Sequence, residues 1–269
     1  MTELLGNPSA GKTTIILSIM KQAQKMFPDK YVVYIDAEHA LDTTWAAKIG
    51  IDLSKFEHIQ PVLAEDALEI LEEYLKTGEA SVIAIDSIPA LLSKVELEGE
   101  IGEANIAIQA RLIAQELRRL CSLLFTQKNS SIIFVNQKRA QLQTRGGFQG
   151  YEPSKATGGK ALPFYVTTRL DISRIGKGSS DYSQEVQVHV LKHKIGYGPG
   201  AKVTFEIDNK TGVDYAQELL SIAEEKGLVI KAGSWISIDG TKVQGEEAAK
   251  KIVREKFADK WTKEFVEEV

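Results

Sequence analysis

The chain has 269 residues, of which 43% are hydrophobic and 26% are charged, and this size and composition suit one globular core with a small second domain. The formal net charge of −4 excludes a general basic field for nucleic acid, so any DNA binding must come from local patches. A single cysteine excludes an intramolecular disulfide framework, and the absence of any apolar run of about 18 residues excludes a membrane-spanning helix, so we expect a soluble, cytoplasmic protein with no membrane partner.

The first recognisable element is the segment GNPSAGKTT, residues 6–14, which fits the pattern G-x-x-x-x-G-K-[ST]. Its glycines let backbone N–H groups curl around phosphate oxygens, and the helix that follows presents its positive end to them. Lys12 would reach the β- and γ-phosphates, and the Thr13 hydroxyl would ligate Mg²⁺. A glycine turn without a ligand is the alternative. The candidate ATP contacts are Gly6, Asn7, Pro8, Ser9, Ala10, Gly11, Lys12, Thr13 and Thr14.

Strands and helices alternate through the middle of the chain. The expected strands are 31–35, 82–86 and 132–135, and the expected helices are roughly 12–27, 64–77 and 103–126. Near-continuous apolar strands between helices are typical of a parallel sheet in a doubly wound α/β fold. Later runs alternate polar and apolar residues and predict antiparallel strands that extend the sheet, at 166–175, 185–195 and 201–207. The sheet should therefore be mixed and mostly parallel.

Carboxylates follow two of the expected strands. Asp86 ends VIAID, where a phosphate-loop protein needs an acid for the Mg²⁺ shell, although a plain helix cap is the alternative. The segment YIDAEHALD offers Asp36, Glu38 and Asp42, one of which could orient or deprotonate an attacking water. Spacing alone does not choose among these three acids, and an acid-rich helix start would explain them equally well.

Residues 138–160 lack periodicity and combine glycines with basic and aromatic side chains. The bases are Lys138, Arg139, Arg145, Lys155 and Lys160, against the single acid Glu152. Such a loop suits the backbone and stacked bases of single-stranded nucleic acid, with an ordinary surface loop as the alternative. Near residue 213 the composition changes, and 213–269 predicts helix, small hairpin and helix. We therefore expect a core at 1–212 and a small α+β C-terminal domain at 213–269.

Taken together, these segments resemble the bacterial RecA recombinase family. The matching motifs, in family order, are GNPSAGKTT, YIDAEHALD, VIAIDSIPAL, ELEGEIGEANIAIQAR, IIFVNQKR, TGGKALPFY, RLDISRIG and LKHKIG. They cover nearly the whole chain, and IDAEHALD and EGEIG are specific to this family among phosphate-loop ATPases. The resemblance implies a RecA-like ATPase core with ATP and Mg²⁺ as cofactors. Frequent departures from the usual bacterial pattern suggest a divergent, for example phage-borne, member.

The resemblance also implies roles at the nucleotide. Glu38 would activate the hydrolytic water, and Gln137 would sense the γ-phosphate and couple it to the loop that follows. Thr13 and Asp86 would hold Mg²⁺. Asp42 and Trp45 would contact adenine; the family usually has Tyr at the second position, and Trp stacks equally well. A core aromatic is the alternative for the tryptophan.

Two lysines are implied to act on a neighbouring molecule. Lys192 and Lys194 would reach the ATP of the next protomer, and their spacing would put both on one face of a strand. Two solvated lysines on an edge strand are the alternative. Phe164 matches the family's interface signalling residue. Pro163 replaces a lysine that the family carries near the neighbour's ATP, and Lys160, in the same stretch, is the candidate substitute.

The resemblance places two loops against DNA, around 97–106 and at 138–160. The candidate DNA-binding residues are Ile106, Arg111, Arg118, Arg139, Leu142, Arg145, Gly158 and Gly159. Ile106 and Leu142 would wedge between base steps. The two arginines at 111 and 118 are seven residues apart and share a helix face, so both could hold phosphates. The glycine pair would let backbone N–H groups approach a phosphate.

The family carries a further helix and strand before the phosphate loop, which dock on the next protomer. Here only TELL could supply the strand that leads into the loop, so we expect a stub of that strand and a truncated or differently assembling chain. The function implied is an ATP-dependent recombinase that forms a filament on single-stranded DNA and exchanges strands with a homologous duplex. A hexameric DNA motor or helicase, and a non-catalytic ATP-binding module that joins filaments of a longer relative, are the alternatives. A repressor whose self-cleavage the family promotes in the SOS response is a further partner implied by analogy.

Overall fold

A computed structural model describes residues 1–99, 106–126, 130–138, 161–178, 181–196 and 199–267 of the chain. The chain divides into two compact units, Met1–Gly212 and Val213–Val269. Within these described ranges, none of the helices has the length and apolar character needed to cross a membrane.

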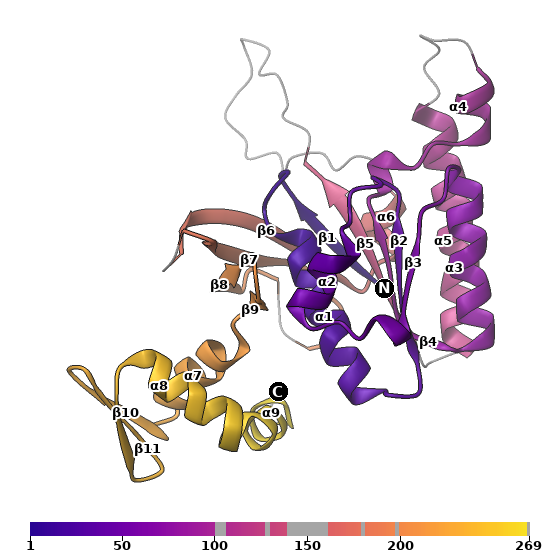
Figure 1. Cartoon of the computed structure of the whole chain (residues 1–269). Coiled ribbons are helices and arrows are strands. Elements are labelled where there is room, and N and C mark those ends of the chain that lie inside the picture. The colour runs from indigo at the N-terminus through magenta and orange to yellow at the C-terminus, as the bar shows by residue number, and fades with distance from the viewer. Residues whose placement is uncertain (100–105, 127–129, 139–160, 179–180, 197–198, 268–269) are drawn as a thin grey trace, which may run out of the picture. The chain divides into compact units, whose positions relative to one another are not determined.

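The first unit is built on a nine-stranded sheet with the order β3-β2-β4-β5-β1-β6-β7-β8-β9 (Figure 1). The strands are β1 (Thr2–Gly6), β2 (Tyr31–Asp36), β3 (Phe56–Ile59), β4 (Ala80–Asp86), β5 (Ser131–Gln137), β6 (Thr168–Lys177), β7 (Ser183–His193), β8 (Lys202–Asp208) and β9 (Gly212–Val213). Pairing is parallel from β3 through to β6 and antiparallel from β6 through β7 to β8. The predicted mixed, mostly parallel α/β sheet is therefore confirmed.

Helices lie on both faces of the parallel part of this sheet (Figure 1). They are α1 (Lys12–Met26), α2 (Thr43–Ile49), α3 (Ala64–Thr77), α4 (Lys94–Glu98), α5 (Ile106–Thr126) and α6 (Ala161–Tyr165). Short 3₁₀ turns span Leu53–Lys55 and Ile88–Ala90. The sequence patterns predicted α1, α3 and the whole of α5 but missed α2 and β3, because seven and four residues are too few to show a clear period.

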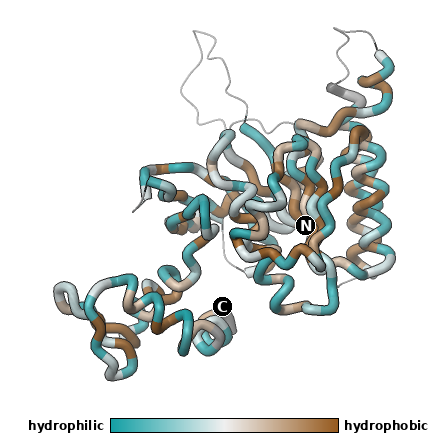
Figure 2. Tube along the Cα trace, viewed as in Figure 1, coloured by the Kyte–Doolittle hydropathy of each residue, from teal (hydrophilic) through white to brown (hydrophobic). Residues whose placement is uncertain are grey.

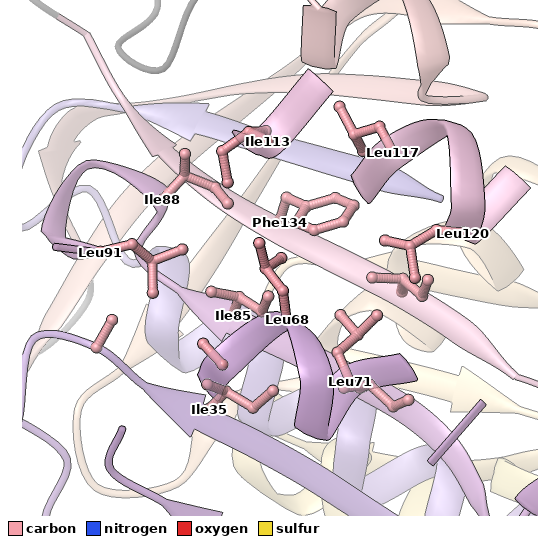
Figure 3. Close-up of a cluster of buried hydrophobic side chains, with 14 of the residues drawn as sticks. Ile35, Leu68, Leu71, Ile85, Ile88, Leu91, Ile113, Leu117, Leu120 and Phe134 are labelled. Carbon is pink, nitrogen blue, oxygen red and sulfur yellow. The ribbon is translucent and has the colours of Figure 1, made fainter. Parts of the chain in front are cut away.

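The side chains of each central strand alternate between the two layers of helices. Val33 and Ile35 of β2 join the cluster formed with α3 and α5, so Val32 and Tyr34 point to the face covered by α1. Phe134 of β5 lies among side chains of α5 and of the neighbouring strand β4 (Figure 3). Figure 2 shows hydrophobic residues concentrated in these strands and alternating with polar ones along the covering helices. This double coverage fixes the strand ends that carry the polar residues described below.

Strand β1 is not the stub that the short leading sequence predicted. Its five residues pair with β5 on one side, from Thr2↔Ile133 to Gly6↔Gln137, and with β6 on the other. Leu4 and Leu5 are buried. Two neighbouring strands satisfy the backbone of this strand, so five residues suffice to place the following loop in the middle of the sheet.

The second unit has its own core. Its elements are α7 (Tyr215–Glu225), β10 (Val229–Ala232), β11 (Trp235–Ile238), β12 (Thr241–Gln244), α8 (Glu246–Ile252), a π-helical turn (Val253–Phe257) and α9 (Ala258–Glu267). The expected hairpin is a three-stranded antiparallel sheet. The third strand follows a two-residue turn at Asp239 and Gly240, whose φ angles of 48° and 78° are those of a hairpin turn. Leu220, Ile238 and Trp261 are buried in this core.

Candidate active site

The phosphate-loop motif occupies the turn between β1 and α1; Gly6 is required there by space, and Gly11 by its backbone angle. A Cβ on Gly6 would lie 2.5 Å from the carbonyl oxygen of Ile172 on β6. Gly11 has a φ of 90°, and a Cβ there would lie 2.8 Å from Ile207 Cδ1. Ser9 also has a positive φ, of 60°. The loop is therefore held in one curled shape by the strands beside it.

Lys12 is buried at the start of α1 and is turned back onto the loop. Its Nζ donates to the carbonyl oxygens of Asn7 at 2.8 Å and Gly6 at 3.2 Å. Burial lowers the pKa of this amine, and the carboxylates of Asp86 and Glu38 oppose that effect. The amine thus lies in a pocket that favours an anion within reach of the loop.

Asp86 ends β4 and accepts two hydrogen bonds on Oδ2, from the Thr13 hydroxyl at 2.8 Å and from the Tyr34 hydroxyl at 2.6 Å. Burial raises the pKa of Asp86, and these two hydrogen bonds oppose the rise. Burial and the neighbouring Asp86 carboxylate raise the pKa of Tyr34 in turn, so the phenol remains a donor. The hydroxyl and carboxylate oxygens of Thr13 and Asp86 meet at the cavity wall, which is the hard oxygen environment that Mg²⁺ prefers.

Glu38 and Gln137 come from different strand ends and contact one another directly. Glu38 Oε1 accepts from Gln137 Nε2 at 2.9 Å and from the Ser87 hydroxyl at 2.5 Å. Glu38 is exposed, and both residues line the same cavity as Lys12. A carboxylate held by two donors at the open side of the loop can face a water molecule in the cavity.

The structure distinguishes the three acids that the sequence left equivalent. Asp36 is 2% exposed and accepts bonds from the Leu41 amide at 3.0 Å and from His58 at 3.0 Å, among others. Burial raises the pKa of Asp36, but these hydrogen bonds outweigh it and bring the pKa below its usual range. Asp42 caps α2 by accepting from the Thr44 amide. Of the three, Glu38 is the one that lines the cavity with Lys12.

This cavity has a volume of about 540 Å³. Its walls are formed by Pro8, Ser9, Ala10, Gly11, Lys12, Thr13, Thr14, Glu38, Trp45, Asp86, Gln137, Arg174, Gln184 and Asn209. Trp45 Nε1 donates to the carbonyl oxygen of Asn209 at 2.6 Å, so the indole ring is anchored at one wall. Asp42, expected beside the tryptophan, lies outside this lining. An aromatic side chain in the same cavity as a phosphate loop suits a purine base.

Three lining residues were not foreseen, namely Arg174, Gln184 and Asn209. All come from the antiparallel strands β6 and β7 and the turn after β8, far from the motif in sequence. The position of Arg174 follows from strand pairing. Ile172 pairs with Gly6, and Arg174 follows two residues later on the same face of β6. Finding it required the pairing register, which the sequence alone does not supply.

Lys192 and Lys194 lie away from this cavity, toward the amino-terminal end of β1. Lys192 pairs in register with Arg169, and its Nζ donates to the carbonyl oxygens of Pro163 at 2.5 Å and Phe164 at 3.1 Å. β7 ends at His193, and Lys194 follows directly, with its backbone N–H donating to the carbonyl oxygen of Thr167 at 3.0 Å. That both lysines share one strand face stays a prediction. Neither lysine lines this chain's own cavity.

The DNA-binding candidates are described only in part. Arg111 and Arg118 are exposed on α5, on the helix face that their spacing predicts. Ile106 begins α5, but its side chain lies outside the described residues. Five further candidates also lie outside the described residues: Arg139, Leu142, Arg145, Gly158 and Gly159.

These features define a phosphate-loop nucleoside triphosphatase. A buried strand, a glycine loop and a helix together carry a buried lysine, and a Thr–Asp pair and a Glu–Gln pair lie at neighbouring strand ends. Comparison with known proteins narrows this class. Residues 1–214 match the model of the RecA N-terminal domain, so the chain belongs to the RecA family, whose members are DNA-dependent ATPases of recombination and DNA repair.

Named relatives agree with this assignment. The chain is 39% identical over 259 residues to "Protein RecA" of Haemophilus ducreyi, covering 95% of this chain and 68% of the relative. It is 39% identical over 257 residues to "Protein RecA 2" of Myxococcus xanthus, covering 94% and 70%. It is 37% identical over 257 residues to the "Mitochondrial DNA repair protein recA homolog" of Dictyostelium discoideum, covering 94% of this chain and 55% of that protein.

Proposed function

We propose that this chain binds ATP with Mg²⁺ in the cavity beside the phosphate loop and hydrolyses it while assembled as a filament on single-stranded DNA. The observation that carries the proposal is the contact between Glu38 and Gln137, which lies in one cavity with Lys12 and the Thr13–Asp86 pair. This set supplies a group for the water, a group for the γ-phosphate and the oxygens for a metal.

Each of these residues has a defined task in the proposed reaction. Lys12 would exchange its contacts to the loop carbonyls for the β- and γ-phosphates, which neutralise its charge better than neutral carbonyls do. Bound Mg²⁺ would neutralise charge on the phosphates, held by Thr13 and Asp86. Glu38 would align the attacking water, while Gln137 would exchange its bond to Glu38 for one to the γ-phosphate. Bound ATP would thereby move the start of the segment after β5.

The far end of the cavity would hold the base. Trp45 is fixed by its bond to Asn209, so its ring can stack on adenine without first losing side-chain freedom. Asp42 holds the amino end of α2, the helix that carries Trp45, and would act on the base through that helix. We assign Asp42 a positioning task for this reason.

The other end of the sheet would meet a second copy of the chain. Phe164 is 73% exposed on α6, where Lys192 binds the backbone, and Lys194 is exposed close by. An exposed aromatic beside cations suits contact with a neighbour's nucleotide site. We propose that this end contacts the ATP of the next protomer, and that Arg111 and Arg118 hold phosphates of the single strand, which would be paired with a homologous duplex in the cytoplasm.

The decisive test is ATP hydrolysis by the purified chain, with and without single-stranded DNA, for Lys12→Ala and for a control, Lys25→Ala. Lys25 is exposed on the same helix and lies outside the cavity lining. We expect turnover that rises with DNA in the parent and the control and falls by about 10³-fold in Lys12→Ala. Turnover that Lys12→Ala leaves intact would contradict the proposal.

Assembly is tested with two exposed phenylalanines. Phe164→Ala should weaken DNA-dependent assembly by about 30-fold, whereas Phe125→Ala, with 79% exposure at the end of α5, should have no effect. Sedimentation with single-stranded DNA measures this, at several salt concentrations, because phosphate contacts make the affinity fall steeply with salt. Ring-shaped particles in the microscope, or an affinity independent of salt, would overturn the filament model.

A further inference from the structure

A buried charge lies in the middle of the sheet, between the two ends just described. Glu3 of β1 is 0% exposed. Its Oε2 accepts from Arg169 Nε at 2.5 Å, and its Oε1 accepts from Asn136 Nδ2 at 2.8 Å. The Arg169 partner is on β6 directly opposite Glu3, and Asn136 lies two residues past its opposite neighbour on β5. A buried carboxylate with two donors is expensive to maintain, so its retention calls for an explanation.

Asn136 connects this carboxylate to the nucleotide site. The residue is 0% exposed, and its Oδ1 accepts from the backbone N–H of Gln137 at 2.9 Å. Because Glu3 accepts on one side and the Gln137 N–H donates on the other, the amide can satisfy both partners in only one orientation. The side chain of Gln137 then reaches Glu38 Oε1 at 2.9 Å. The backbone that carries Gln137 is thus fixed by a side chain whose own position depends on Glu3.

Arg169 connects the same carboxylate to the other end of the sheet. It pairs in register with Lys192, whose amine binds the carbonyl oxygens of Pro163 and Phe164. A displacement of α6 by a neighbouring molecule would therefore reach Arg169 through one strand pairing. Each remaining step as far as Glu38 is a hydrogen bond between 2.5 and 2.9 Å.

We propose that Arg169, Glu3 and Asn136 form a positioning relay that holds Gln137 against Glu38. The relay couples the end of the sheet beside α6 to the hydrolysis site. This inference rests on the proposed function. None of the three residues lines the cavity, so they are positioning residues that act through Gln137. Contact with a neighbour at α6 would alter the Arg169–Glu3 bond, free or reorient the Asn136 amide, and so release Gln137 toward the γ-phosphate.

The competing explanation is a buried ion pair that only stabilises the fold. That role would lower stability in a variant. It would leave unchanged the hydrogen exchange of the Gln137 backbone N–H and the coupling of the three residues to Gln137. The two roles are separated by a double-mutant cycle, because residues acting through one group give non-additive losses.

The experiment compares Glu3→Gln, Asn136→Ser, Gln137→Ala and both double variants that include Gln137→Ala, with Ile133→Val as a core control on β5. In Glu3→Gln, a side-chain amide would face two donors, so we expect DNA-stimulated turnover to fall about tenfold while ATP affinity changes by less than about threefold. Adding Gln137→Ala should give no more than the loss seen for Gln137→Ala alone. Ile133→Val should keep the DNA stimulation at a matched loss of thermal stability.

Hydrogen exchange provides a readout that does not depend on hydrolysis. The backbone N–H of Gln137 should exchange its hydrogen about tenfold faster in Glu3→Gln and Asn136→Ser, and not in Ile133→Val. Additive losses in the cycle, or unchanged exchange, would overturn the relay. Absence of DNA-stimulated turnover in the parent chain would count against the proposed function, and the exchange data would still decide the relay. If Glu3→Gln fails to fold, the Asn136→Ser cycle decides.

Discussion

The ends of β2 and β4 are neighbours in register, with Asp36 opposite Asp86, and yet the two aspartates behave in opposite ways. Asp36 accepts backbone amides and side-chain donors that lower its pKa below the ordinary value. Asp86 has two hydroxyl donors, and burial raises its pKa above the ordinary value. The first carboxylate stabilises the fold that surrounds it. The surroundings of the second disfavour its charged form, which suits a group whose proper partner is a cation supplied with the nucleotide.

The largest expected effect comes from Asp86→Asn. The substitution keeps an oxygen for Thr13 and Tyr34 but removes the charge, so turnover should fall by about 10²–10³-fold. Without Mg²⁺ the free energy of unfolding at pH 7 should stay level or rise by about 1 kcal/mol, because a buried charge is lost. ATPase assays measure the turnover, and urea unfolding measures the free energy of unfolding. The control is Asp66→Asn, at an exposed position on α3. A clear loss of stability at pH 7 would erase the contrast between the two aspartates.

Asp36→Asn should give the reverse result. It weakens the bonds from the Leu41 amide and His58, so the free energy of unfolding should fall by about 2–3 kcal/mol at pH 7. Residual turnover per folded molecule should remain within about tenfold of the parent, since Asp36 lies outside the cavity that holds Lys12 and lines only a smaller pocket beside it. Urea unfolding beside the same Asp66→Asn control gives the stability. If Asp36→Asn abolished hydrolysis in a stable protein, the structural assignment of Asp36 would be wrong.

The pH dependence of the stability lost in Asp36→Asn sharpens the comparison between the two aspartates. The folded pKa of Asp36 lies below its ordinary value of 3.8, so its contribution is present above pH 3.8 and is lost as the pH falls through the folded pKa. The gap in unfolding free energy between parent and Asp36→Asn should therefore be full at neutral pH and shrink by up to about 1 kcal/mol toward pH 3. A gap that grows on acidification would contradict the direction of the shift. Urea midpoints across this range measure it.

The smallest effect is expected from Tyr34→Phe. Loss of one hydroxyl donor to Asp86 should cost about 1 kcal/mol of stability and raise the pKa of that carboxyl further. Hydrolysis should consequently need more Mg²⁺ to reach half its maximal rate. Tyr74→Phe on α3, which lies outside both strand ends, serves as the matched control. Equal Mg²⁺ requirements in parent and Tyr34→Phe would show that the phenol does not act on Asp86.

The difference between these two strand ends also shows how far sequence reasoning reaches. The alternation of strands and helices predicted the α/β order, and the motif predicted a phosphate loop that ends in Lys12 and Thr13 at the start of α1. The choice among the acids at 36, 38 and 42 depended on which amides and strands surround each one. Those partners, such as His58 on the unforeseen β3, are distant in sequence, and their contacts exist only once the strands pair.

The antiparallel side of the sheet was harder to interpret for the same reason. Its strands were foreseen, but the entry of Arg174 into the cavity depends on the register of β6 against β1. The position of Lys192 beside α6, where its amine binds two carbonyl oxygens, likewise depends on strand pairing and not on its spacing from Lys194. Local patterns therefore defined the elements, while the pairing of remote strands decided which side chains share a site.

Gly6 has a consequence for any library that samples every amino acid in the phosphate loop. A methyl group at this position would meet the Ile172 carbonyl oxygen at 2.5 Å, which is backbone and cannot rotate away. Variants at Gly6 would thus be depleted under selection even if nucleotide were never needed. A phenotype at this residue would report the spacing between two strands, whereas Lys12, whose side chain reaches into the cavity, reports chemistry. Genetic data on the motif should accordingly be scored position by position and never pooled.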